Sequence, residues 1–145
     1  PKTDVSNAYP IEVPEKNTVK SKVVEEVVIE PILALLANAN IESGEKISKK
    51  CVACHGFEAG GPNKVGPNLY NIVNKEQGKA DYAYSKVLAS LSGTWTYEEL
   101  NKFLYKPKLY SKGTKMNYAG LSKTKDRADL IAWLRTKSDS PASLP

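Results

Sequence analysis

The sequence is short of the side chains that bind metals and form disulfides. Its 145 residues include two cysteines, one histidine and one methionine. A structural zinc site requires four cysteine or histidine ligands, and this chain is one short. The two cysteines, Cys51 and Cys54, are so close together that a disulfide between them would close a loop too small to stabilise a fold. Zinc-stabilised and disulfide-stabilised folds are therefore not expected.

The sequence also lacks a long apolar run and an initiator methionine. No apolar run approaches eighteen residues, so we expect no membrane-spanning helix among these residues. The one methionine is Met116, which lies far from the first residue. We therefore expect a processed N-terminus, from which either a signal peptide or a membrane anchor is missing.

Positive charge is in excess, but it is unevenly distributed. Residues 1–30 contain four Lys and six Asp or Glu, a net charge of −2, whereas the remainder contains 17 basic and 10 acidic residues, a net charge of +7. A basic surface can attract nucleic acid, a membrane or an acidic protein. No recognition-helix or aromatic–basic sheet motif is present, so we expect no nucleic-acid partner.

The chain divides into a tail and one domain. Residues 1–22 contain three prolines and no sustained apolar period, which is typical of an extended tail. The following VVEEVVIE predicts either a short strand or an ordered approach to the domain. We therefore expect a linker over residues 1–30, C-terminal to the missing segment, and a domain over residues 31–140.

The domain pattern predicts an all-α fold of four to five short helices with long loops. Pro31 suits the first turn of a short helix, and Thr96 begins a capping box for a helix that must end before Pro107. Further helices are predicted over residues 43–54, about 84–91 and 124–137, and loops over 56–74 and 106–120. Such a chain buries little apolar area, and a large cofactor would supply the missing core.

CVACH, from Cys51 to His55, has the spacing C-x-x-C-H of a haem c attachment site. Each thiol would add to one porphyrin vinyl group, and the adjacent imidazole would bind iron. Two other interpretations of the pair are weaker. A thioredoxin-like redox pair requires a βαβ context, which is absent, and a nucleophilic Cys–His pair lacks an evident third orienting residue.

A second iron ligand is suggested by Met116, in the loop KPKLYSKGTKMNYAGL. Gly113 and Gly120 lie on either side of it and suit a loop that turns back on itself. The alternative is an ordinary surface or core methionine. Ligation by histidine and methionine would fill both axial positions of the iron, which favours electron transfer over oxygen chemistry.

Together these motifs resemble class I cytochromes c. The resemblance runs from Gly44 to Lys137 and rests on CVACH, GPNL at 66–69, GTW at 93–95, KPKLYSKGTKM at 106–116 and DLIAWL at 129–134. With its proline-rich leader, the chain is similar to the alphaproteobacterial membrane-anchored members, and mitochondrial cytochrome c is a close cousin. The resemblance implies a cytochrome c fold wrapped around one covalent haem.

The resemblance also implies roles for individual residues. Cys51 and Cys54 would form the thioether links, and His55 and Met116 would ligate the iron. The carbonyl of Pro67 would accept a hydrogen bond from the ring N–H of His55, which fixes the tautomer of the ring. Two further groups are implied: Tyr84, Trp95 and Thr114 would hydrogen-bond a haem propionate, and Leu69, Leu104 and Tyr118 would wall the haem. Leu130, Trp133 and Leu134 would pack the last helix across the first.

Three positions depart from the family pattern. Asn74-Lys75 stands where an arginine near the propionates is usual, and Phe103 stands where many members have a tyrosine beside the ligating methionine. Ile47-Ser48 replaces the usual aromatic of the first helix, so we expect a different packing of the terminal helices. With one hydrogen bond missing on the sulfur side, we expect a looser Met116 loop.

Seven lysines flank the haem motif or the methionine loop: Lys50, Lys64, Lys106, Lys108, Lys112, Lys115 and Lys123. They could simply be a solvated charged face. The resemblance favours a docking ring for acidic redox proteins, namely a cytochrome bc1-type complex and cytochrome c oxidase. The expected function is a monomeric one-electron carrier from quinol–cytochrome c oxidoreductase to a terminal oxidase, periplasmic and tethered to the inner membrane. The alternative is a haem enzyme or gas sensor, peroxidase-like, with a labile methionine ligand.

Overall fold

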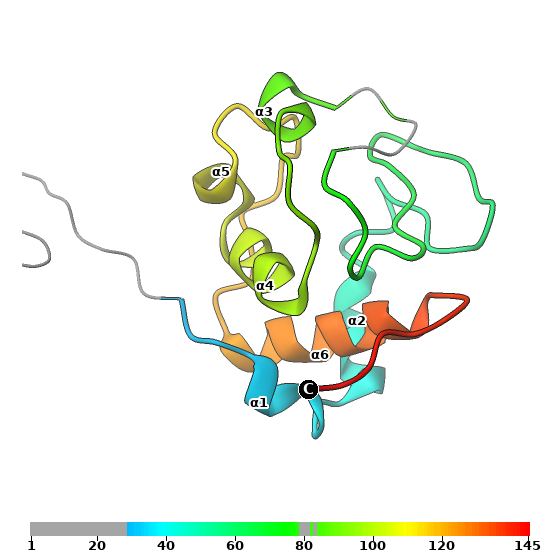
Figure 1. The fold of residues 1–145 in the computed structure, drawn as a ribbon, viewed down its shortest axis with the longest axis vertical. Coiled ribbons are helices and arrows are strands. Elements are labelled where there is room, and N and C mark those ends of the chain that lie inside the picture. Colours follow the sequence, from blue (N-terminus) through cyan, green and yellow to red (C-terminus); the bar gives the residue numbers. More distant parts are fainter. Residues whose placement is uncertain (1–28, 79–81, 83) are drawn as a thin grey trace, which may run out of the picture.

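The computed structural model describes residues 29–78, 82 and 84–145, and within them it is helical (Figure 1). The helices are α1 (Leu33–Leu36), α2 (Ile41–Ser48), α3 (Lys86–Ala89), α4 (Tyr97–Tyr105), α5 (Pro107–Tyr110) and α6 (Thr124–Thr136). An isolated antiparallel bridge joins Glu76 and Thr94, and the described residues form no longer strand. The predicted all-α class is confirmed. The predicted tail, up to residue 28, lies outside the described residues.

Side-chain caps begin three of the helices. The side chains of Asn40, Ser85 and Thr96 accept hydrogen bonds from backbone N–H groups in the first turns of α2, α3 and α4. These caps satisfy donors that would otherwise lack an intrahelical partner. The N-cap half of the capping box predicted at Thr96 is therefore present, but the reciprocal bond is not, because the N–H of Thr96 donates to the carbonyl of Thr94. The helix α4 ends at Tyr105, before the following proline, as predicted.

One predicted helix boundary was wrong, and one short helix was missed. The helix predicted over residues 43–54 ends at Ser48, and hydrogen-bonded turns follow it through the cysteines. The segment predicted as loop over 106–120 contains α5, which begins at Pro107. Proline is well suited to a first helical position because that position needs no N–H donor, so this helix start was readable from the sequence.

The scaffold is built on α6, which packs against α1, α2 and α4. Leu130, Ile131, Trp133 and Leu134 are buried along it. The helices α2 and α6 cross at Gly44, where an added Cβ would lie 2.1 Å from the carbonyl oxygen of Asp129. Only glycine allows this approach. An aromatic partner for Trp133 comes from Phe57, with ring centroids 5.0 Å apart, rather than from α2.

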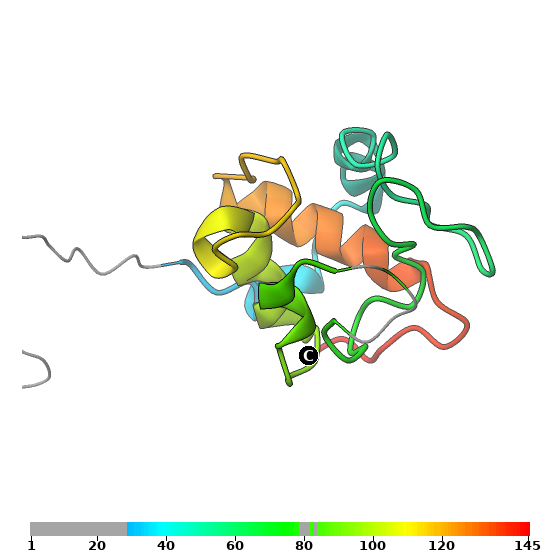
Figure 2. The same ribbon diagram turned by 90° about the horizontal axis from the view of Figure 1, so that it is seen from above.

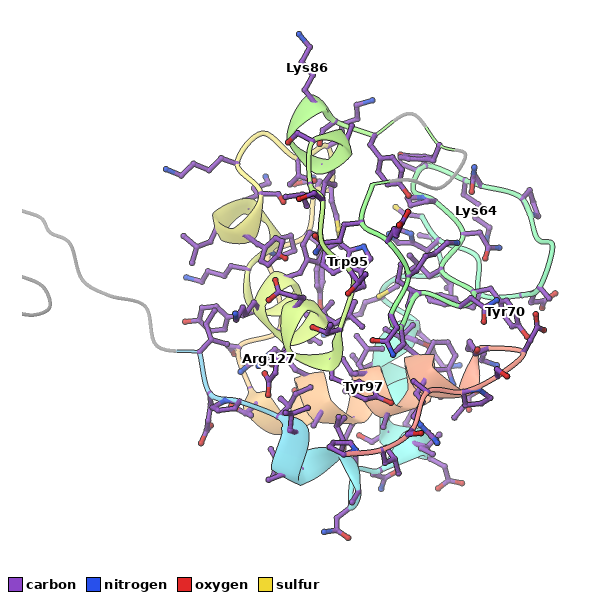
Figure 3. The ribbon with its side chains drawn as sticks, viewed as in Figure 1. Lys64, Tyr70, Lys86, Trp95, Tyr97 and Arg127 are labelled. Atoms are coloured by element: carbon purple, nitrogen blue, oxygen red, sulfur yellow. The ribbon has the colours of Figure 1, made fainter. Side chains whose placement is uncertain are left out.

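Charged side chains join α4 and α6 to the segment that leads into α1. Arg127 on α6 is 1% exposed, and it donates to the side-chain oxygen of Asn101 on α4 at 2.7 Å. Glu98 on α4 accepts hydrogen bonds from the backbone of Ile32 and Leu33. Figure 3 shows Arg127 where these elements meet. The approach to α1 is thereby fixed to the scaffold from Ile32 onward.

The rest of the chain lies in two parts, one made of a long loop and the other of short helices and their connections. In Figures 1 and 2 the loop of residues 56–78 lies on one side, and α3, α4 and α5 lie on the other. The cysteines follow α2 on the first side, and the chain carrying Met116 follows α5 on the second. The two parts of the predicted site are therefore carried by segments that are distant in the sequence, one on each side.

Candidate functional site

Cys51, Cys54 and His55 lie on one hydrogen-bonded turn. The backbone N–H groups of Cys54 and His55 both donate to the carbonyl of Cys51, at 3.0 and 2.8 Å. The Cys51 side chain is half-buried, and that of Cys54 is exposed. This turn places both sulfurs and the imidazole at the end of α2, as attachment of one porphyrin through two thioethers requires.

The imidazole of His55 is held from behind by the loop that follows it. Its Nδ1 lies 2.7 Å from the carbonyl oxygen of Pro67, so Nδ1 carries the proton and Nε2 keeps its lone pair, with which it could bind a metal. Gly66 donates its backbone N–H to the carbonyl of Cys54 at 2.7 Å. An added Cβ on Gly66 would lie 2.4 Å from Cε1 of the ring. The backbone thus forms a close-fitting support for the ring.

Burial disfavours the charged forms of His55 and Cys51. Burial lowers the pKa of His55, although the hydrogen bond to Pro67 acts in the opposite direction. Burial and then the charge of Cys54 raise the pKa of the Cys51 thiol, while Lys50 acts to lower it. A nucleophilic cysteine needs a lowered thiol pKa, so this geometry does not favour the nucleophile interpretation.

The Met116 loop, residues 111–121, runs from the end of α5 to the approach of α6. Gly113 and Gly120 have positive φ angles of 85° and 110°. An added Cβ at Gly120 would lie 2.1 Å from the carbonyl oxygen of Tyr105, so the turn requires glycine there. Met116 is half-buried, and its N–H donates to the hydroxyl of Thr114 at 3.3 Å.

The residues predicted to wall the haem pack against one core. Leu104 is 7% exposed, while Leu69, Tyr118 and Cys51 are half-buried against the same core. Burial raises the pKa of Tyr118. The Met116 loop thus contributes Tyr118 to the same core as Cys51. Two thiols and an imidazole on one turn, with this apolar core beside them, fit a covalent haem.

The aromatic residues predicted near the propionates pack against other aromatic rings. Trp95 is 8% exposed and packs edge-on against Phe103, with ring centroids 5.1 Å apart (Figure 3). Tyr84 is half-buried and packs edge-on against Tyr82 at 5.0 Å. The hydroxyl of Tyr82 donates to the carbonyl of Val65 in the loop after His55. Tyr82 thus joins the segment before α3 to the His55 side of the site.

Sequence reasoning missed several residues that shape the site. Phe57 supports Trp133, and Gln77 and Tyr110 form a part-buried hydrogen bond beside Trp95. Arg127 was overlooked because charged residues are seldom fully buried. Of these residues, only Tyr110 could have been found from the sequence, because Pro107 favours the start of a short helix and Tyr110 ends it.

All seven candidate docking lysines are exposed: Lys50, Lys64, Lys106, Lys108, Lys112, Lys115 and Lys123. Lys64 donates to the carbonyl of Val52 at 3.1 Å, and Lys108 lies 3.4 Å from the side-chain oxygen of Asn117. In the described residues, no group of three His, Cys, Asp or Glu side chains could hold a metal ion. No helix in that part of the chain is long and apolar enough to cross a membrane.

Comparison with known proteins gives a consistent result. A family model described as Cytochrome c matches residues 41–138. The chain is 47% identical over 118 residues to a cytochrome c homolog of Bradyrhizobium diazoefficiens, covering 80% of this chain and 64% of that protein. It is 42% identical over 105 residues to cytochrome c of Theileria parva, covering 72% of this chain and 91% of that protein.

A solved structure supports the same fold. Cytochrome cH from Methylobacterium extorquens matches with a TM-score of 0.64 and 39% sequence identity, covering 68% of this chain and 100% of that chain. Two bacterial cytochrome c homologs are longer than the present chain. It spans 64% of the Bradyrhizobium protein and 59% of a cytochrome c homolog of Rickettsia felis, to which it is 45% identical over 103 residues, or 70% of this chain.

Proposed function

Because the chain belongs to the cytochrome c family, we propose that it is a one-electron carrier in which His55 and Met116 are the two iron ligands. The predicted family, the cytochrome c fold and the covalent haem c cofactor are confirmed by the comparisons. The family also supports the general role of a haem-based electron carrier. The ligand pair, the partners and the cellular location are the finer parts of this proposal.

The single observation that carries the proposal is the 2.7 Å contact between Nδ1 of His55 and the carbonyl oxygen of Pro67. It fixes the ring in the tautomer that offers Nε2 as a ligand, and it increases the basicity of that nitrogen. Cys51 and Cys54 would hold the haem covalently on the same turn. Haem c supplies a one-electron couple between ferrous and ferric iron.

The role of Met116 is to close the other axial position. Its thioether is the one methionine sulfur in the chain, and Tyr118 of its loop packs against the same core as Cys51. An iron with both axial positions filled exchanges electrons without binding oxygen or peroxide. Leu69, Leu104 and Tyr118 would exclude water from the haem between the two ligands. Tyr84, Trp95 and Thr114 would hydrogen-bond a propionate.

We place the partner surface at the exposed lysines around the site. Like charges around one edge attract an acidic protein and raise the association rate more than the affinity, which suits a carrier that must also dissociate. A quinol–cytochrome c oxidoreductase as donor and a terminal oxidase as acceptor fit this chemistry. Their reaction with the carrier should slow as ionic strength rises. Rates that do not respond to salt would reject the docking ring.

Periplasmic location with a tether to the inner membrane completes the proposal. The covalent attachment motif and the similarity to bacterial cytochrome c homologs support the location. The acidic, proline-containing segment of residues 1–30 has the composition of a linker. Fractionation of cells that express the full-length protein tests this: recovery in the soluble periplasmic fraction would contradict a tether.

The test of the ligand pair is the optical spectrum of the ferric holoprotein, alone and with added cyanide. Ligation by methionine should give the weak red absorption band of a sulfur–iron bond, and cyanide should bind slowly because it must displace the sulfur. Met116→Ala should abolish the band and make cyanide binding fast. A high-spin spectrum of the unsubstituted protein, with immediate cyanide binding, would instead favour the peroxidase-like enzyme or sensor.

A further inference from the structure

A hydrogen-bond chain joins three separate segments beside Trp95. Nε2 of Gln77 donates to the hydroxyl of Tyr110 at 2.9 Å, and that hydroxyl donates to Oε1 of Glu99 at 2.5 Å. Gln77 follows the Glu76–Thr94 bridge, Tyr110 ends α5, and Glu99 lies in the first turn of α4. The Tyr110 hydroxyl accepts one hydrogen bond, from Gln77, and donates another, to Glu99, so it links all three segments.

The chain is built into the structure rather than lying loosely on its surface. Gln77 is 4% exposed, and an added Cβ on Gly93 would lie 3.1 Å from its amide oxygen. The Tyr110 ring packs against Trp95 and Phe103, with ring centroids 5.7 and 5.6 Å away. Lys102 lies 3.3 Å from the other oxygen of Glu99 and the Glu99 N–H donates to the cap at Thr96. The acceptor is therefore held in place from two sides.

Tyr110 is also where the Met116 loop begins. The loop starts at Ser111, directly after α5, and rejoins the scaffold where the N–H of Leu121 donates to the carbonyl of Leu104 at 2.8 Å. The helix α5 is only four residues long, so its own backbone bonds cannot fix its position. Side-chain contacts hold it in place, and the bond from the Tyr110 hydroxyl to Glu99 on α4 is the shortest of those described.

We propose that Gln77, Tyr110 and Glu99 act as positioning residues that hold α5 on α4 and so keep the Met116 loop closed over the iron. This inference rests on the proposed ligation by Met116. Phe103 on α4 has no hydroxyl and cannot hold the Met116 loop by a hydrogen bond. The Tyr110 hydroxyl on α5 would supply that restraint instead. A hydrogen bond to a carboxylate contributes more than one between neutral groups, so loss of this one should be measurable.

The experiment compares ferric holoprotein carrying Tyr110→Phe or Glu99→Gln with the unsubstituted protein. Imidazole is added at neutral pH, and its binding rate is followed by loss of the red methionine–iron band. Both variants should keep the band and bind imidazole about tenfold faster, because the loop opens more often when the hydrogen bond to the carboxylate is lost or weakened. Equal rates in all three proteins would overturn the inference.

Tyr97→Phe is the matched control. Tyr97 lies on the same helix, α4, and its hydroxyl donates to the carbonyls of Ala142 and Ser143, far along the chain from the Met116 loop. Its removal should lower the thermal midpoint without changing the imidazole rate. If the control accelerated binding as much as Tyr110→Phe, the effect would be general destabilisation and the inference would fail. Absence of the red band in the unsubstituted protein would instead reject ligation by Met116.

Discussion

The His55 loop, residues 55–69, and the Met116 loop are restrained in different ways. In the His55 loop, Gly66 and Leu69 donate backbone bonds of 2.7 and 2.8 Å to Cys54 and Gly56, ten or more residues away. In the Met116 loop, Thr114 donates to Ser111 at 3.1 Å and Met116 donates to Thr114 at 3.3 Å. The first set of bonds crosses the loop, whereas the second set only shapes it locally.

This difference teaches that the two proposed ligands need different support. The covalent links and His55 share one turn, so that side can be rigid without cost to function. The Met116 loop depends on its ends, at α5 and at Leu121, and on the contacts that hold those ends. We therefore expect the methionine side to open first under any stress, while the histidine side stays closed.

The largest expected effect compares one glycine from each loop. An added methyl group at Gly66 would lie 2.4 Å from the His55 ring, whereas at Gly113 it would meet nothing within 4 Å. Gly66→Ala should lower the free energy of unfolding of the holoprotein by about 3 kcal/mol or more through overpacking. Gly113→Ala should cost about 1 kcal/mol, because its positive φ alone is strained. Urea unfolding measures both, and similar losses would contradict the comparison.

A smaller effect concerns pH and the contact between α5 and α4. Burial first, and then the hydrogen bond to Glu99, raise the pKa of Tyr110 to about 12. A raised pKa means that the folded state favours the protonated phenol. Its contribution to stability is therefore fully present below the unfolded value, about 10, and is lost as pH rises toward about 12.

The measurement is the difference in unfolding free energy between the unsubstituted protein and Tyr110→Phe across that range. It should be constant near neutral pH and shrink by about 1–2 kcal/mol above pH 10, allowing for partial solvent screening. The difference removes contributions from lysines, which titrate in both proteins. A difference that stays flat through pH 11 would show that the phenol is not held as the structure has it.

How much of this was readable from the sequence depends on how local each feature is. The attachment turn and the start of α4 at Thr96 are set by neighbouring residues, so their patterns predicted them. The all-α class followed from helical spacing and capping alone. The end of α2 at Ser48 could not be read, because the helical spacing of Ile47, Cys51 and Cys54 continues into turns that follow it.

Features that depend on contacts between distant segments were beyond the sequence. Phe57 reaches Trp133 and Gln77 reaches Tyr110 only because the chain folds these segments together. The expected change in packing at the terminal helices was readable from Ile47-Ser48, but the source of the replacement aromatic was not. A buried cation such as Arg127 looks like a surface residue until its partners are known.

The smallest expected effect tests how loosely the Met116 loop is fitted. Ser111 is fully buried, and within the described residues its hydroxyl is the one buried side-chain oxygen without a hydrogen-bond partner. An unpaired buried hydroxyl costs free energy, so Ser111→Ala should raise the unfolding free energy by about 1 kcal/mol. Ser85 is a matched buried serine, and its hydroxyl caps α3 by accepting from Leu88. Ser85→Ala should lower stability by about 1 kcal/mol, the opposite sign. If Ser111→Ala also proved destabilising, the hydroxyl would have a hydrogen-bond partner in solution. The start of the Met116 loop would then be held more firmly than the comparison of the two loops implies.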